Sequence, residues 1–116
     1  MRHPEQALQR AVAHYLNLAL PDDAWFTAFP AGGGGRVRGA ILKGMGLKAG
    51  VPDILIVWRG RAYWLELKAP GGRLNMAQGV TFHRLWRCDS PAVVARNLDD
   101  VWQALTEWGI PSRARP

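Results

Sequence analysis

The acids Asp53 and Glu66, with Lys68 close by, stand in two neighbouring apolar runs of this sequence. Only Arg59-Gly60 separates the two runs, and this length and composition predict a tight hairpin turn. Counting outward from such a turn sets Asp53 opposite Glu66 on one face, with Cβ atoms about 5 Å apart. Lys68, two residues beyond Glu66, points to that same face. A turn longer by one residue would offset the two acids.

Two carboxylates at this separation repel each other unless a cation lies between them, and a divalent metal with oxygen ligands is the natural candidate. Such an ion polarises a phosphate and lowers the pKa of a bound water. A neighbouring lysine stabilises the extra negative charge of the transition state. The simpler interpretation, a salt bridge between Glu66 and Lys68, leaves Asp53 without a partner. The spacing therefore favours a divalent-metal site over a simple salt bridge.

Two further polar residues are candidates for this site. Glu5 precedes Leu8 by three and Val12 by seven, which places it on the apolar stripe of a first helix; Gln9 is the competing candidate there. An acid at that position is also simply favoured by the helix dipole. Gln78 falls near the start of a later helix, where a polar residue is commonly just solvated.

The formal net charge is +6 over 116 residues, which favours a polyanionic partner such as DNA. Four cations follow the glycine run 32–35 and precede the acidic hairpin. We expect a mobile basic loop here, with a short helix around 40–43, that contacts DNA phosphates. A solvated connector would have the same composition. The four cations are Arg36, Arg38, Lys43 and Lys48.

Other classes of function find little support. The sequence has no apolar run of 18 residues and no signal-peptide pattern, which predicts a cytosolic protein. Cys88 is the only cysteine, which excludes an internal disulfide, and we expect it to be half-buried on a helix. The glycine run lacks the Gly-Lys-Ser or Gly-Lys-Thr that completes a phosphate-binding loop.

The candidate residues lie on predicted helices and strands that together form one domain, 1–116. Hydrophobic periodicity, caps and breakers predict the order helix, strand, strand, strand, helix, strand, helix. Val80 and Trp86 should face inward from the second helix, and the basic tail 112–116 should be disordered. The predicted helices are 4–20, 74–87 and 98–108, and the predicted strands are 24–29, 52–58, 61–68 and 92–95.

Pro52-Asp53, followed after a gap of twelve residues by Glu66-Leu67-Lys68, resembles the PD-(D/E)xK nuclease superfamily. The run from Lys43 to Asp53, Lys-Gly-Met-Gly-Leu-Lys-Ala-Gly-Val-Pro-Asp, with Gln78 downstream, is similar to a VRR-NUC domain that spans nearly the whole chain. The resemblance implies an α/β fold, a restriction-endonuclease-like αβββαβ core with a mixed central sheet flanked by helices. It also implies a magnesium- or manganese-dependent nuclease.

The resemblance assigns roles to the residues of the hairpin. Asp53, Glu66 and the backbone carbonyl of Leu67 would hold the metal ion. Lys68 would position or activate the attacking water and help to neutralise charge on the phosphate. Glu5 would correspond to the acidic residue on the first helix of the family.

The resemblance also implies a substrate and an assembly. Gln78 would match the glutamine on the helix after the catalytic strand. Stand-alone members of the family are similar to small phage and bacterial enzymes that act as homodimers on branched DNA, as Holliday junction resolvases do. The alternatives are a flap, nicking or less selective nuclease, a DNA-binding module without catalysis, and a structural subunit of a larger assembly.

Overall fold

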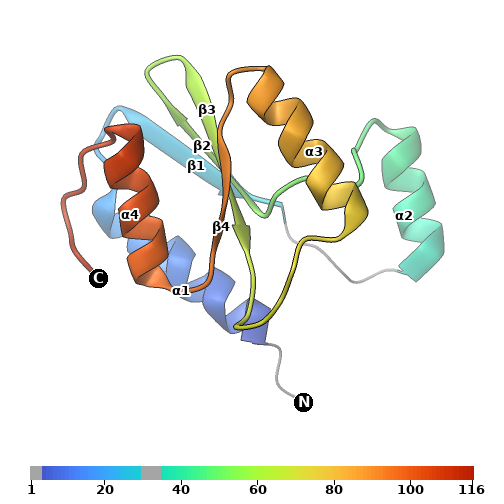
Figure 1. Cartoon of the computed structure of the whole chain (residues 1–116), viewed down its shortest axis with the longest axis horizontal. Coiled ribbons are helices and arrows are strands. Elements are labelled where there is room, and N and C mark those ends of the chain that lie inside the picture. Colours follow the sequence, from blue (N-terminus) through green and yellow to red (C-terminus); the bar gives the residue numbers. More distant parts are fainter. Residues whose placement is uncertain (1–3, 30–34) are drawn as a thin grey trace.

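A four-stranded mixed sheet with helices on both faces forms the body of the protein (Figure 1). The computed structural model describes residues 4–29 and 35–116. Strands β1, β2 and β3 are antiparallel neighbours, and β4 runs parallel to β3. The predicted α/β class and mixed sheet are therefore confirmed. The elements are α1 (Pro4–Ala19), β1 (Ala24–Ala28), α2 (Gly35–Gly44), β2 (Ile54–Trp58), β3 (Arg61–Leu67), α3 (Met76–Arg87), β4 (Ala92–Ala95) and α4 (Leu98–Trp108).

The turn between β2 and β3 has the predicted two residues. Arg59 and Gly60 both have positive φ, 48° and 78°, as type I′ hairpin turns require. Trp58 pairs with Arg61, and the ladder continues to Ile54 opposite Leu65. The predicted register is confirmed, and it carries Asp53 and Glu66 to facing positions at the open end of the hairpin.

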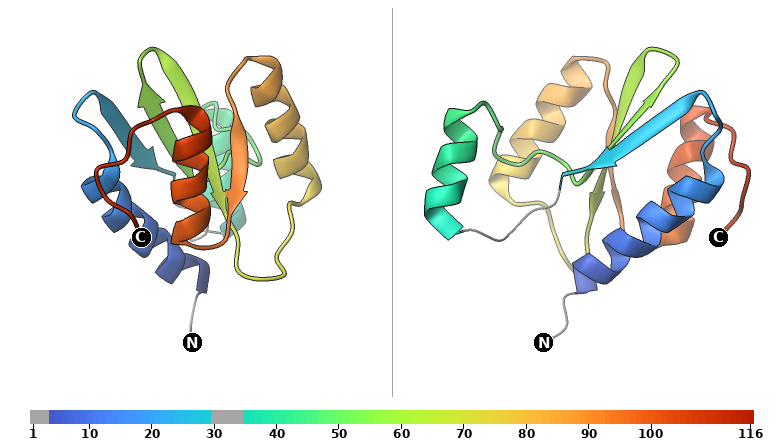
Figure 2. Two further views of the ribbon diagram at one scale, coloured as in Figure 1. Left: turned by 60° about the vertical axis from the view of Figure 1, so that its left-hand side comes forward. Right: turned by 180° about the vertical axis from the view of Figure 1, so that it is seen from behind.

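The hydrophobic core lies between the sheet and the layer formed by α1 and α4 (Figure 2). Alternate residues of β2 and β3, such as Ile56 and Leu65, point into this layer and are fully buried. Leu16 from α1 and Leu105 from α4 meet them there. The sheet and these two helices therefore form a rigid support, and the opposite face of the sheet remains available for α3. No helix within the described ranges is both long enough and apolar enough to span a membrane.

Helix α3 covers the second face of the sheet less completely than its sequence predicts. Val80 and Trp86 are 55% and 54% exposed, so their expected inward positions were wrong, and the half-burial expected for Cys88 was wrong too, since its side chain is exposed. Figure 1 shows α2 beyond α3, but α2 leaves Val80 and Trp86 exposed. Trp86 is held by its indole Nε1, which donates to the carbonyl of Ala92 at 3.1 Å.

The basic segment before the hairpin is a ten-residue helix, longer than the predicted turn of helix around 40–43. Arg36 and Arg38 belong to this helix, α2, so the loop predicted for them was wrong; Gly32 to Gly34 lie outside the described residues. Ordinary helix formers follow Gly35, and they include an apolar stripe at four-residue spacing. Val37 and Ile41 of this stripe are 74% and 57% exposed, and Met45, in the turn that follows the helix, is 78% exposed.

The carboxyl-terminal segment 112–116 packs against α1, so the predicted disorder was wrong. The amide of Arg113 donates to the carbonyl of Ala19 at 2.8 Å. The hydroxyl of Tyr15 donates to the carbonyl of Ala114 at 2.8 Å. Ile110, just before this segment, is buried in the core, and the two hydrogen bonds hold the segment against α1.

Candidate active site

Glu66 is a buried carboxylate on the α3 side of β3. It is 3% exposed, although it interrupts an otherwise apolar strand. Its Oε2 accepts a hydrogen bond from Nε2 of Gln78 at 3.1 Å and lies 3.5 Å from Nζ of Lys68. Its Oε1 is buried and has no hydrogen-bond partner among the described residues. A buried charged oxygen without a partner is costly, so this atom calls for a cation or a proton.

Asp53 is the residue immediately before β2, and it faces Glu66. Its backbone carbonyl accepts a hydrogen bond from the amide of Phe29 at 2.7 Å, which fixes the main chain. Its Oδ2 accepts from the amide of Leu67 at 2.7 Å, so the side chain bridges the open end of the hairpin. The carboxylates of Asp53 and Glu66 are therefore held together by the sheet, as the register predicts.

The two carboxylates share an unfavourable electrostatic environment. Burial and the neighbouring charge of Asp53, opposed by Lys68, together raise the pKa of Glu66 to about 7. Burial also raises the pKa of Asp53, against the hydrogen bond from the Leu67 amide, and the charge of Glu5 adds to the increase. Below about pH 7 the pair therefore holds a proton in the absence of a cation, and a bound cation would favour the ionised form of both groups.

The donor set fits a hard divalent ion that keeps part of its water shell. Asp53 and Glu66 offer neighbouring carboxylate oxygens, and the resemblance adds the backbone carbonyl of Leu67 as a further oxygen donor. Within residues 4–29 and 35–116, no cluster of three or more His, Cys, Asp or Glu side chains could enclose an ion. Mg²⁺ is bound in proteins by one or two carboxylates together with several waters, whereas a structural Zn²⁺ needs four protein ligands.

Glu5 and Gln78 stand in different relations to this pair. Gln78 donates directly to Glu66 from the first turn of α3. Glu5 is exposed in the first turn of α1, so its expected burial was wrong, although its charge acts on Asp53. The structure thus brings Gln78 into contact with the acidic pair and leaves Glu5 beside it.

Sequence reasoning missed how the chain before Asp53 is locked to α3. Gly50 has φ +77°, and a Cβ at this position would lie 2.4 Å from the carbonyl carbon of Ala77 and 2.6 Å from the amide of Gln78. The hydroxyl of Thr81 donates to the carbonyl of Ala49 at 2.8 Å. The glycine in Gly50-Val51-Pro52-Asp53 was the available signal, since only glycine permits this approach.

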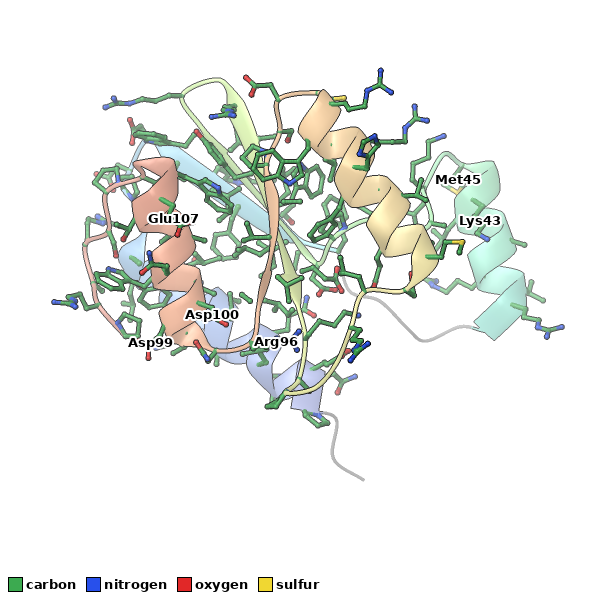
Figure 3. The ribbon with its side chains drawn as sticks, viewed as in Figure 1. Lys43, Met45, Arg96, Asp99, Asp100 and Glu107 are labelled. Atoms are coloured by element: carbon green, nitrogen blue, oxygen red, sulfur yellow. The ribbon has the colours of Figure 1, made fainter. Side chains whose placement is uncertain are left out.

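A second residue missed from the sequence supports the turn that follows Lys68. The guanidinium of Arg96, at the end of β4, donates from Nη1 to the carbonyl of Ala69 at 2.9 Å. Its backbone amide donates to Oδ2 of Asp100, in the first turn of α4, at 2.9 Å. Figure 3 shows Arg96 and Asp100 at the same end of the sheet, near the start of α4.

The four predicted DNA-contacting cations belong to a separate segment, α2 and the loop after it. Arg36, Arg38 and Lys43 project from α2, and Lys48 follows it in the loop that leads to Gly50. All four side chains are exposed, and within the described structure none of them forms a salt bridge. Figure 3 shows Lys43 on α2, beyond α3 from the core.

Comparison with known proteins gives one informative likeness. No protein-family model and no curated protein matches the sequence. Among solved structures, a chain described as "VRR_NUC domain protein" superimposes with a TM-score of 0.74 at 24% sequence identity. The match covers 93% of this chain and 89% of that chain. The fold implied by the sequence resemblance is therefore confirmed.

Proposed function

We propose that this protein is a VRR-NUC-type nuclease that hydrolyses DNA phosphodiester bonds with the help of Mg²⁺ or Mn²⁺. The observation that carries the proposal is the buried, unpartnered Oε1 of Glu66 beside Asp53. Lys68 and Gln78 both approach the other oxygen of the same carboxylate. The likeness in fold to a VRR_NUC domain protein supports the same class of enzyme.

The residues of the site have separate tasks in this proposal. Asp53, Glu66 and the Leu67 carbonyl hold the ion, which, when bound, supplies a Lewis acid and a water of lowered pKa. Gln78 fixes the orientation of the Glu66 carboxylate. Lys68 is a cation held 3.5 Å from that carboxylate, where it orients the attacking water and stabilises negative charge that develops on the phosphate.

We further propose that the substrate is branched DNA and that the enzyme acts as a homodimer. Symmetric cleavage of a four-way junction requires two active sites, which a two-fold dimer provides. The exposed apolar residues Val37 and Ile41 of α2, with Met45 in the turn after it, support self-association, because such a patch is costly to leave in water.

A cleavage assay on labelled four-way junction, flap and plain duplex DNA tests this function. Each substrate is incubated with Mg²⁺, Mn²⁺ or EDTA and with wild type, Lys68→Gln or Arg113→Gln protein. Arg113 is the control, because it lies on the C-terminal segment and pairs with exposed Asp22. We expect metal-dependent cleavage that Lys68→Gln reduces at least about 10²-fold.

Each pattern of products has a defined meaning. Paired nicks on the junction alone support the resolvase assignment, and sedimentation of the free protein as a dimer supports the assembly. Cleavage mainly at flaps or along duplex keeps the nuclease and changes its substrate. Tight DNA binding without cleavage in either metal contradicts the enzyme and leaves a DNA-binding module.

A further inference from the structure

A second cationic surface lies along the outer side of α3, apart from the acidic pair. Its lining combines Lys48 and Ala49 from the loop after α2 with Val80, Arg84 and other residues of α3. A hollow of about 430 Å³ opens there, and it is lined by Lys48, Ala49, Val80, Thr81, Arg84, Leu85 and Cys88. A second hollow of about 340 Å³ adjoins it, lined by Arg84, Arg87 and Cys88.

The charges of this surface are of one sign. Helix α3 carries His83, Arg84 and Arg87 and contains no acidic residue. The nearest acid in sequence, Asp89, is already paired with Arg61 at 2.8 Å. Lys48, Arg84 and Arg87 form no salt bridge with any residue that the structure describes. Unpaired cations around an apolar floor suit a backbone of phosphates and sugars.

The surface is continuous with the acidic pair through α3 itself. Gln78 contacts Glu66 from the first turn, and Arg84 and Arg87 follow it by six and nine residues on the same helix. At 1.5 Å per residue these cations lie roughly 9 and 14 Å along the axis from Gln78. Successive phosphates of one strand rise by about 3.4 Å along the axis of a duplex, so this span covers a few phosphates.

We infer that the outer side of α3 with Lys48 binds the DNA strand a few phosphates away from the cleaved bond. This inference rests on the proposed nuclease function. Arg84 and Arg87 contact successive backbone phosphates, Lys48 contacts the strand from the opposite rim, and the floor formed by Val80 and Leu85 packs against deoxyribose.

The salt dependence of DNA binding tests the charged contacts. Affinity of a fluorescein-labelled four-way junction is measured by anisotropy in EDTA between about 50 and 200 mM salt, because each lost phosphate contact lowers the slope of log K against log salt by about 0.9. The test variant is Arg84→Gln/Arg87→Gln. The control is Arg113→Gln/Arg115→Gln, which removes the same charge from the opposite side of the molecule (Figure 1).

The inference predicts that the slope falls by about 1 to 2 in the test variant and stays at the wild-type value in the control. Thermal melting confirms that both variants fold. Equal changes in both variants would mean that only net charge matters, and no change in the test variant would overturn the inference outright. If wild type cleaves DNA while the slopes are unaffected, the proposed function stands without this surface. If wild type neither binds nor cleaves, the function itself fails.

The single cysteine supplies an independent readout in the wild-type protein. Cys88 lines both hollows and is exposed, so a neutral maleimide should alkylate it rapidly. The inference predicts that saturating junction DNA slows this alkylation at least several-fold. An unchanged rate with DNA bound would show that the strand follows another path.

Discussion

The side chain of Gln78 joins the carboxylate of Glu66 to the first turn of α3. Its Nε2 donates to Oε2 of Glu66 at 3.1 Å. Its Oε1 accepts from the amide of Asn75, and its own amide donates to Oδ1 of Asn75, both at 2.9 Å. One residue therefore completes a helix cap and orients a candidate metal ligand, which ties the site to the position of the helix.

Substitutions of Asn75 and Gln78 separate the two roles of Gln78, which caps α3 and contacts Glu66. Asn75→Ala and Gln78→Ala should each lower the free energy of unfolding by about 1 kcal/mol, because each removes the reciprocal cap. Only Gln78→Ala also frees Glu66, so it should reduce the cleavage rate about 10- to 100-fold. Urea denaturation and single-turnover cleavage measure the two effects. An equal loss of cleavage in Asn75→Ala would assign Gln78 a capping role alone.

Substitution of Gly50 tests the contact between α3 and the segment that precedes Asp53. Gly50→Ala introduces a Cβ that would lie 2.4 Å from backbone atoms of Ala77, at a φ of +77°. Gly60→Ala is the matched control, because Gly60 has φ +78° and open space around it. Both variants carry backbone strain of about 1 kcal/mol, and Gly50→Ala should lose a further 1 to 3 kcal/mol or so from the clash. Equal destabilisation of the two variants in denaturation experiments would show that α3 shifts to accommodate the added methyl group at no cost.

The sequence predicts most of the sheet and the acidic pair, because local rules determine them. A two-residue turn fixes the register, and the register places Asp53 opposite Glu66. The approach of Gly50 to Ala77 could not be predicted in this way, because it depends on the distance between two elements. The exposure of Val80 was missed for a related reason: helical periodicity shows which residues share a face, but not how much of that face a neighbouring element covers.

The raised pKa of Glu66 makes the metal-free protein less stable as the pH rises. The ordinary pKa of this group is 4.5 and its folded value is about 7, so between these values the folded state holds a proton that the unfolded state has lost. The contribution of Glu66 to stability is therefore full below pH 4.5 and falls as the pH rises through about 7, by a total on the order of a few kcal/mol.

Glu66→Gln removes this titration and should stabilise the metal-free protein at pH 8 while it abolishes cleavage. Denaturation in EDTA at several pH values measures the difference between the variant and wild type. The expected difference grows from pH 5 to pH 7 and then levels off. A difference that is constant with pH would contradict the raised pKa.

Docking of the carboxyl-terminal segment should contribute to stability. Tyr15→Phe removes the hydrogen bond to the Ala114 carbonyl and should cost about 1 kcal/mol. Tyr63→Phe is the control, since Tyr63 is similarly buried and its hydroxyl forms no hydrogen bond within the described structure. Denaturation midpoints compare the two variants. If the segment were disordered in solution, the two substitutions would have the same small effect.

The central claim is that Asp53 and Glu66 hold a divalent ion, and a titration of Mn²⁺ followed by electron paramagnetic resonance tests it without any substrate. At pH 8, wild-type protein should reduce the resonance signal of free, hydrated Mn²⁺ as it binds the ion. Glu66→Gln should reduce this signal far less. Lys68→Gln should bind at least as well as wild type, because it keeps both carboxylates and removes a competing cation. Equal Mn²⁺ binding by wild type and Glu66→Gln, or none by wild type, would contradict the account.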